Sequence, residues 1–279
     1  MNRPDDVYTH GHHESVLRSH RWRTAENSAG YLLDALTPGT RLLDVGCGPG
    51  TITLDFARRV APGAVVGIDR EPDVLESARI AAREAGVDNV EFVPGDVYAL
   101  EFDDDSFAVV HAHQVLQHLT DPVAALREMR RVCAPNGIVA ARDSDYAAFT
   151  WFPDDPRLTR WLELYHDVAR GNDAEPDAGR HLLQWAHAAG FATVEASASV
   201  WCFANDEDRA WWGGMWSDRV VASAFAEQAV DRGFANRDEL EDLSDAWRAW
   251  STSPDGWFAI LHGEIRCYPV TYRSNGGPS

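Results

Sequence analysis

The stretch LLDVGCGPGT, residues 42–51, decides the fold of this chain of 279 residues. Its mostly apolar first half is followed by three glycines at every second position, Gly46, Gly48 and Gly50. This pattern is typical of a buried strand that turns tightly into a helix, as at the nucleotide sites of α/β proteins. Taken alone it is weak evidence, because many such turns only allow a strand and a helix to pack closely.

Short runs rich in β-branched residues alternate with amphipathic stretches around this turn. Strands are predicted at RLLDVG, AVVGID, VEFVPGD, FAVVHAH and GIVAARD, and helices at 51–60, 74–85 and 122–133. Such an alternation predicts parallel strands joined by crossover helices. The expected fold class is therefore α/β, with a doubly wound, Rossmann-like sheet whose cofactor-binding core spans residues 37–145.

The two ends of the chain have a different pattern. Apolar residues at three- and four-residue spacing predict a helix from Glu14 to Leu36, so residues 1–36 are expected to form an N-terminal helical lid. Residues 146–279 are expected to form a helical cap that carries the substrate region, plus the last two strands. In that part helices are predicted at 157–169, 180–189 and, as one block, 206–250, and strands at FATVEASASVWCF and WFAILHGEIRCYPV.

Composition is that of an ordinary globular protein, with a hydrophobic share of 45%. No apolar run approaches the roughly 18 residues that cross a bilayer, and the first residues lack the apolar core of a secretory signal. We therefore expect a cytoplasmic protein without a membrane span. The four cysteines lie far apart, which favours neither a disulfide framework nor a structural zinc site. The sequence leaves the oligomeric state open, a homodimer included.

The formal net charge of −19 argues against nucleic acid as a partner, because binding to a phosphate backbone depends on Lys and Arg. A small molecule is the expected partner instead. The group His10, His12, His13 and Glu14 has the composition of a set of metal ligands. It lies near a chain end without a distant partner, however, so it favours a lid segment and no metal site is predicted.

The spacing of the acidic residues bears on the ligand of the turn. The dinucleotide fingerprint is GxGxxG, whereas the third glycine here comes one residue early. Asp69 ends the next strand, where a carboxylate can accept hydrogen bonds from both hydroxyls of a ribose, in NAD or in any other adenosine ligand. Asp96 ends the strand after that, where its carboxylate can accept from an adenine amino group while the amide of Val97 donates to a ring nitrogen. No phosphate needs to be contacted.

Four segments resemble one family. They are LLDVGCGPGT (42–51), VVGIDREPDVLESAR (65–79), FVPGDVYALEFDDDSFAVVHAHQVLQHLTDP (92–122) and APNGIVAARD (134–143). In order and spacing they resemble the class I S-adenosylmethionine-dependent methyltransferases, specifically the small-molecule group related to ubiquinone and menaquinone methyltransferases. The resemblance implies S-adenosyl-L-methionine as cofactor and a seven-stranded sheet whose last two strands form an antiparallel hairpin.

The resemblance also implies roles for individual residues. Asp44 and Gly46 would lie near the methionine part of the cofactor, Asp69 would hold the ribose, and Asp96 with Val97 would hold the adenine. His113 and Gln114 would follow the fourth strand beside the sulfonium. The full set of expected cofactor-binding residues is Asp44, Gly46, Gly48, Gly50, Asp69, Arg70, Asp96, Val97, His113 and Gln114. The alternatives are that Asp44 caps the following helix and that Asp96 is a turn residue.

Methyl transfer is an in-line displacement, so the enzyme mainly aligns a nucleophile against the methyl group and excludes water. A base is needed only where the acceptor loses a proton, and His113 and His118 are the candidate catalytic residues. His118 has a packing role as its alternative, and His111 is expected to be structural. Asp143, Asp145 and Tyr146 follow the fifth strand and either meet the acceptor or belong to a loop.

Tryptophan is the most unusual feature of the composition, with 11 residues of which only Trp22 precedes the glycine turn. We hypothesise that Trp151 and the segment WWGGMW, residues 211–216, line an acceptor pocket, whereas the alternative is that these rings fill the core of the cap. The sequence thus predicts methyl transfer to a small apolar or aromatic acceptor, at a C, O or N atom that it does not identify. The alternatives are an NAD(P)-dependent oxidoreductase and a non-catalytic S-adenosylmethionine-binding protein.

Overall fold

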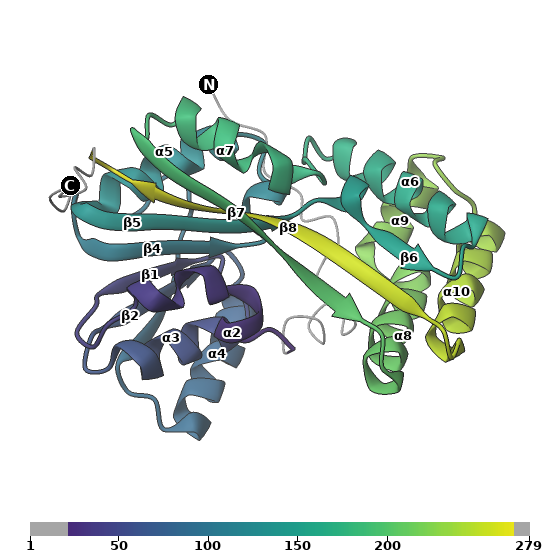
Figure 1. The fold of residues 1–279 in the computed structure, drawn as a ribbon, viewed down its shortest axis with the longest axis horizontal. Coiled ribbons are helices and arrows are strands. Elements are labelled where there is room, and N and C mark those ends of the chain that lie inside the picture. The colour runs from purple at the N-terminus through teal and green to yellow at the C-terminus, as the bar shows by residue number, and fades with distance from the viewer. Residues whose placement is uncertain (1–21, 271–279) are drawn as a thin grey trace, which may run out of the picture.

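A computed structural model describes residues 22–270 of the chain (Figure 1). Five parallel strands form one side of the central sheet, and their bounds are close to those predicted except that the fifth begins at Cys133 rather than at Gly137. They are β1 (Leu42–Val45), β2 (Val65–Asp69), β3 (Val90–Pro94), β4 (Phe107–His113) and β5 (Cys133–Ser144). The order across the whole sheet is β3-β2-β1-β4-β5-β8-β6, with β7 paired to β8. The doubly wound α/β fold is confirmed.

The last long strands form the antiparallel hairpin that the resemblance implied. Strand β7 (Thr193–Phe203) pairs with β8 (Trp257–Tyr268) along its whole length, and β8 runs antiparallel to β5. An eighth strand, β6 (Thr150–Phe152), was not predicted. Pairing between β5 and β8 stops at Ser144 and His262, so the first residues of β8 extend beyond β5, and β6 covers that exposed edge.

Helices cover both faces of the sheet because neighbouring residues in each strand point to opposite sides. Leu42 and Val109 pack with α3 (Thr51–Val60), while Leu43 and Val110 pack with α5 (Pro122–Val132) and α7 (Ala178–Ala188). Helix α4 (Pro72–Ala85) packs against Phe92 of β3. Helix α5 begins as its sequence predicts, since the Asp121 carboxylate accepts a hydrogen bond from the amide of Ala124 at 2.9 Å.

The long N-terminal helix predicted from Glu14 to Leu36 is wrong over the part that the structure describes. That part holds the short helix α2 (Ala25–Ser28) and a 3₁₀ helix η1 (Gly30–Ala35). Thr24 and Asn27 form a capping box, which starts a new helix at Ala25. Residues 1–21, which hold more than half of the predicted lid and the group of histidines near its start, lie outside the described residues.

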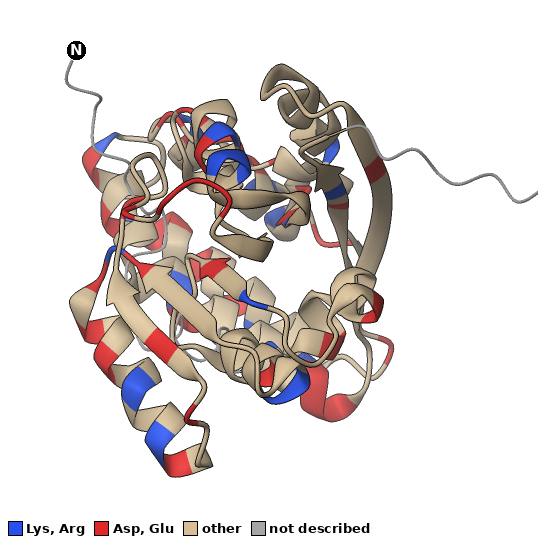
Figure 2. Cartoon of the chain, turned by 90° about the vertical axis from the view of Figure 1, so that its left-hand side faces the viewer, with Lys and Arg blue, Asp and Glu red and all other residues tan. Residues whose placement is uncertain are grey.

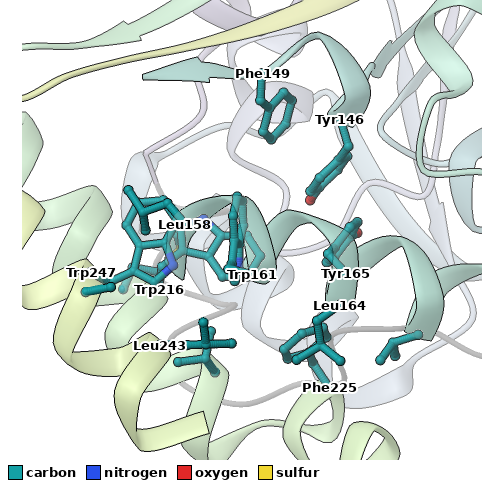
Figure 3. Close-up of a cluster of buried hydrophobic side chains, with 14 of the residues drawn as sticks. Tyr146, Phe149, Leu158, Trp161, Leu164, Tyr165, Trp216, Phe225, Leu243 and Trp247 are labelled. Atoms are coloured by element: carbon teal, nitrogen blue, oxygen red, sulfur yellow. The ribbon is translucent and has the colours of Figure 1, made fainter. Parts of the chain in front are cut away.

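The cap comprises a short 3₁₀ turn η3 (Tyr146–Ala148), strand β6 and four helices. The helices are α6 (Pro156–Arg170), α8 (Asp206–Ala222), α9 (Ala224–Asp231) and α10 (Arg237–Thr252), so the block predicted over 206–250 is divided into three. Its core is separate from those of the sheet: the Trp161 ring lies 4.5 Å from that of Trp216 and 4.8 Å from that of Trp247, centroid to centroid (Figure 3).

The charged residues lie mainly around this framework rather than within it. Figure 2 shows Asp and Glu spread over the helices and loops that surround the sheet. No helix between residues 22 and 270 is long and apolar enough to cross a membrane.

Candidate active site

A cavity of about 290 Å³ lies where the carboxyl ends of the parallel strands meet the cap. Its lining comes from the turn after β1, the ends of β2, β4 and β5, the loop after β3, and the cap. Ligands of doubly wound sheets bind at this edge, where the strand order reverses. One cavity therefore joins the glycine turn to the aromatic residues of the cap.

The glycines of the turn differ in position. Gly46 and Gly48 have positive φ and line the cavity, and a Cβ atom on Gly46 would collide with the side chain of Val115. Gly50 precedes α3 in the left-handed conformation, and a Cβ atom there would lie 2.8 Å from the Phe92 ring. Gly50 thus packs against β3 and is not itself a lining residue, although its neighbours Pro49 and Thr51 are.

Asp44 lines the cavity although only 3% of its surface is exposed. Its Oδ2 accepts a hydrogen bond from the Thr53 hydroxyl at 2.6 Å, and its Oδ1 accepts one from Nδ1 of His111 at 2.8 Å. Asp44 therefore bonds to a side chain of α3 rather than capping its backbone. His111 is fully buried behind this carboxylate, in the structural position expected for it.

Asp69 connects the end of β2 to the glycine turn. Its Oδ2 accepts from the amide of Gly48 at 3.0 Å, and its Oδ1 accepts from the amide of Glu71 at 3.1 Å. Arg70 follows it on the cavity wall.

The loop after β3 begins two residues earlier than predicted, since the strand ends at Pro94. Asp96 is consequently exposed, and its Oδ1 accepts from the amide of Tyr98 at 3.0 Å. Gly95 and Val97, on either side of Asp96, line the cavity, whereas Asp96 itself is not among the lining residues.

His113, at the end of β4, is only 6% exposed and lines the cavity. Neither of its ring nitrogens has a hydrogen-bond partner. Burial, reinforced by the nearby cations of Arg23 and Arg142 and by His262, holds the pKa of this imidazole well below its usual value. A neutral imidazole with two unsatisfied nitrogens costs stability, as is common where a ligand supplies the missing partners.

Gln114 is held from both sides of its amide group. Its Oε1 accepts from Nη2 of Arg23 at 2.6 Å, and its Nε2 lies 3.0 Å from Nε2 of His262. His262 Nδ1 is 3.2 Å from the carbonyl of Ile260, so this network assigns the proton to Nδ1 and leaves Nε2 to accept from Gln114. Gln114 therefore fixes Arg23 over the cavity.

His118 also lines the cavity, but its Nε2 already lies 3.1 Å from Nε2 of Gln117. The Gln117 carbonyl accepts from the Ser144 hydroxyl at 2.6 Å, so the Gln117 amide is oriented to donate to His118. Burial, with Arg23 as the second cause, lowers the pKa of His118 to about 3. The lone pair that a base would use is thus engaged within the protein.

The polar residues at the end of β5 and just after it have different surroundings. Asp143 is fully buried, and its Oδ1 accepts from the amide of Gln117 at 3.1 Å; burial raises the pKa of its carboxyl group to about 7. Asp145 accepts from Nε of Arg180 at 2.6 Å. Both support the scaffold and neither is a lining residue, whereas Tyr146 lines the cavity.

The aromatic wall of the cavity consists of Tyr146, Phe149, Trp201, Trp211 and Trp212. Of the tryptophans in the hypothesis, Trp211 and Trp212 line this cavity, and their contact with an acceptor stays a prediction. Trp151, whose ring stacks on that of Phe258 at 5.7 Å, and Trp216, which lies in the cap core, do not line it. These two are outside the lining because their rings pack within the cap.

Three lining residues were missed or left undecided by the sequence patterns. Trp201 on β7 and Arg219 on α8 belong to segments without a recognisable motif, and Arg23 lies in the expected lid, where the spacing singles out no residue. Beside Arg23, the Trp22 ring stacks on Trp211 at 5.3 Å. In the described part of the chain no group of three or more His, Cys, Asp or Glu residues could hold a metal ion.

Comparisons with known proteins agree with this geometry. Residues 36–201 match a family described as a methyltransferase domain. An uncharacterized methyltransferase of Schizosaccharomyces pombe is 34% identical over 95% of this chain and 98% of its own length. Demethylmenaquinone methyltransferase of Staphylococcus aureus is 38% identical over 107 residues, which cover 38% of this chain and 44% of that protein.

A solved structure has a similar fold. The YcgJ protein from Bacillus subtilis has a TM-score of 0.57 and 21% identity, over 87% of this chain and 98% of that one. The matching domain covers more than half of the chain, and the S. pombe relative matches nearly all of it. The chain therefore belongs to this methyltransferase family.

Proposed function

We propose that the protein transfers a methyl group from S-adenosylmethionine to a small aromatic or apolar acceptor that binds against the cap. The single observation that carries the proposal is the continuity of the cavity. The same space is lined by Gly46 and Asp69 on one side, by His113 in the middle, and by Trp211 and Trp212 on the other. Cofactor and acceptor can therefore meet beside the end of β4.

The cofactor side fits an adenosine ligand without phosphate. We assign the ribose to Asp69, whose carboxylate lies at the end of β2 beside Gly48, and Asp44 contributes a buried carboxylate beside the path of the methionine part. We assign the adenine to the loop 95–97, where the amide of Val97 can donate to the ring and Asp96 can accept from its amino group. The turn uses its amides within the protein, since that of Gly48 donates to Asp69, and this favours a ligand that needs no anion cradle.

The chain's own residues align and deprotonate the acceptor. When bound, the cofactor supplies an electrophilic methyl group, so the enzyme only needs to orient the nucleophile in line with it. We assign His113 as the base for acceptors that lose a proton, because its imidazole is neutral and its nitrogens are unoccupied. His118 is the weaker candidate, because Gln117 occupies its Nε2. The aromatic wall excludes water from the reacting atoms.

A direct test is incubation of the pure protein with labelled S-adenosylmethionine and a panel of phenols, aromatic acids, indoles and quinones. Mass spectrometry should detect a product heavier by one methylene unit and, in equal amount, S-adenosylhomocysteine. The atom methylated follows from the product's fragmentation. A parallel titration with NADH addresses the oxidoreductase alternative, for which binding of NADH but not of S-adenosylhomocysteine would be required.

A further inference from the structure

Within residues 22–270, the edges of the sheet are formed by β3, β6 and β7. An edge strand exposes backbone amides and carbonyls to which another strand can bind, and proteins protect such edges with short strands, charged residues or proline. Strand β3 has 5 residues, which include Glu91 and Pro94, and β6 has 3 residues and is followed by Pro153. These two edges are therefore protected.

Strand β7 lacks this protection. It has 11 residues, all of which pair with β8, and no strand between residues 22 and 270 pairs with its other side. Its segment 196–203 contains neither a charged residue nor a proline. A long, uncharged edge of this kind pairs readily with another strand.

The two faces of β7 have different neighbours. On the inner face, the hydroxyls of Ser197 and Ser199 donate hydrogen bonds to the Glu264 carboxylate, and Trp201 lines the cavity. The side chains that alternate with these point to the outer face, where they are small or apolar and exposed. They are Ala196, Ala198, Val200 and Cys202, and Val200 is 54% exposed. The inner face is thus occupied within the chain, whereas the outer face and the edge are open.

The edge of β7 is complementary to itself. Ala198 is the midpoint of the strand, so antiparallel pairing with the same strand of a second copy places Ala198 opposite the partner's Ala198. In this register Ala196 lies opposite the partner's Val200, and both point to the same face. Glu195 lies opposite the partner's Trp201, so no two like charges meet across the pair.

The charge of the chain also favours a second copy as the occupant. Two copies with a formal net charge of −19 each repel one another, so they can associate only where charge is absent, as it is over 196–203. An anionic lipid surface would be repelled by the same charge. A basic partner would be drawn to the acidic surface rather than to this uncharged edge.

We propose that two copies of the chain associate through β7, with the two strands paired antiparallel about a two-fold axis at Ala198. The pairing joins the two sheets into one and leaves neither copy with an open β7 edge, so assembly stops at the dimer. Each copy keeps its own cavity, because Trp201 points to the inner face while the pairing uses the edge. The proposal is independent of the proposed methyl transfer.

The oligomeric state of the full chain tests the proposal. Sedimentation velocity at micromolar concentrations should show two chains per particle. Ala198→Glu places two carboxylates directly opposite each other and should weaken association by about tenfold or more. Ile80→Glu is the matched control, since Ile80 is 43% exposed on α4, and it should associate like the wild type.

Circular dichroism and thermal unfolding report whether each variant is folded, which is expected for Ala198→Glu because Ala198 is exposed in the single chain. A wild type that sediments as a single chain, as it would if residues 1–21 or 271–279 of the same chain covered the edge, overturns the proposal. So does an open polymer, or a folded Ala198→Glu variant that associates as tightly as the wild type.

A second variant tests the register. Residues directly opposite in antiparallel strands have Cβ atoms about 4.5–5.5 Å apart, so Ala198→Cys should form a disulfide between the two copies under mild oxidation. The exposed Cys202 is a control within the chain, because it lies opposite the partner's Val194 and roughly 27 Å from the partner's Cys202, at about 3.4 Å per residue. Electrophoresis without reductant should show a linked pair for Ala198→Cys alone. Equally fast linkage in the wild type would contradict pairing at Ala198.

Discussion

Replacement of His113 by Gln tests the assignment of the base. A positioned base contributes roughly 10² to 10⁴ in rate, which corresponds to about 3 to 5 kcal/mol of activation free energy. Neither ring nitrogen of His113 has a hydrogen-bond partner among residues 22–270, so within this part of the chain the change removes only its ring contacts with Trp201 and His262. We expect kcat to fall by about a hundredfold or more, with little change in the affinity for S-adenosylhomocysteine.

The pH profile sharpens this test. The basic form of His113 is required, and its folded pKa lies well below 6.5, so kcat/KM should stay level as pH falls through 6.5 and decline only at lower pH. The assay follows label transfer to the acceptor found in the screen, with His118→Gln as comparison. Because Gln117 already engages His118, that variant should lose less activity than His113→Gln. Retention of activity within about threefold in His113→Gln, where a base is worth at least a hundredfold, would refute the assignment.

The remaining predictions concern the wall, the turn and acid stability. Trp212→Ala should weaken acceptor turnover far more than cofactor affinity, measured by kinetics and calorimetry, because Trp212 lines the cavity from the cap; equal losses would count against the acceptor pocket. Gly46→Ala should weaken cofactor binding, and Val115→Ala in the same chain should restore part of it by removing the collision, while positive φ keeps a cost of about 1 kcal/mol. For His118 the pKa is about 3 folded and 6.5 unfolded, so the unfolded state binds more protons between these values. Stability is therefore full above about pH 6.5 and falls by up to roughly 1.4 kcal/mol per pH unit below it. The free energy of unfolding, measured with urea, should fall less from pH 7.5 to pH 5 in His118→Gln than in the control variant at His187, whose side chain is exposed. Identical losses in the two variants would contradict a buried, neutral His118.

Local sequence patterns were sufficient for the parallel half of the sheet. The glycine turn, the β-branched runs and the prolines at the first positions of α4 and α5 all act within a few residues, and α3 has the predicted bounds Thr51–Val60. The N-terminal helix was predicted too long because the prediction followed the apolar spacing alone. It overlooked the capping box of Thr24 and Asn27, which starts a new helix at Ala25. Strand β6 could not be predicted, since it forms only because β8 extends past Ser144.

The acceptor side of the site depends on contacts between distant segments. Aromatic residues occur on several faces of α8, so the spacing of Trp211, Trp212 and Trp216 does not reveal which rings face the cavity. A signal for His262 was present: His262, Glu264 and Arg266 occupy every second position of β8 and share one face of the strand, beside Arg142 of β5. Polar residues at strand spacing in a buried strand indicate a polar network, which here holds Gln114.

Calorimetric titration of the pure protein with S-adenosylhomocysteine tests the central claim most directly. We predict saturable binding with one site per chain and a loss of about tenfold or more in affinity for Asp69→Ala, which removes the carboxylate at the end of β2. A folded protein that gives no heat with this ligand, or an Asp69→Ala variant that binds it as tightly as the wild type, would contradict the account.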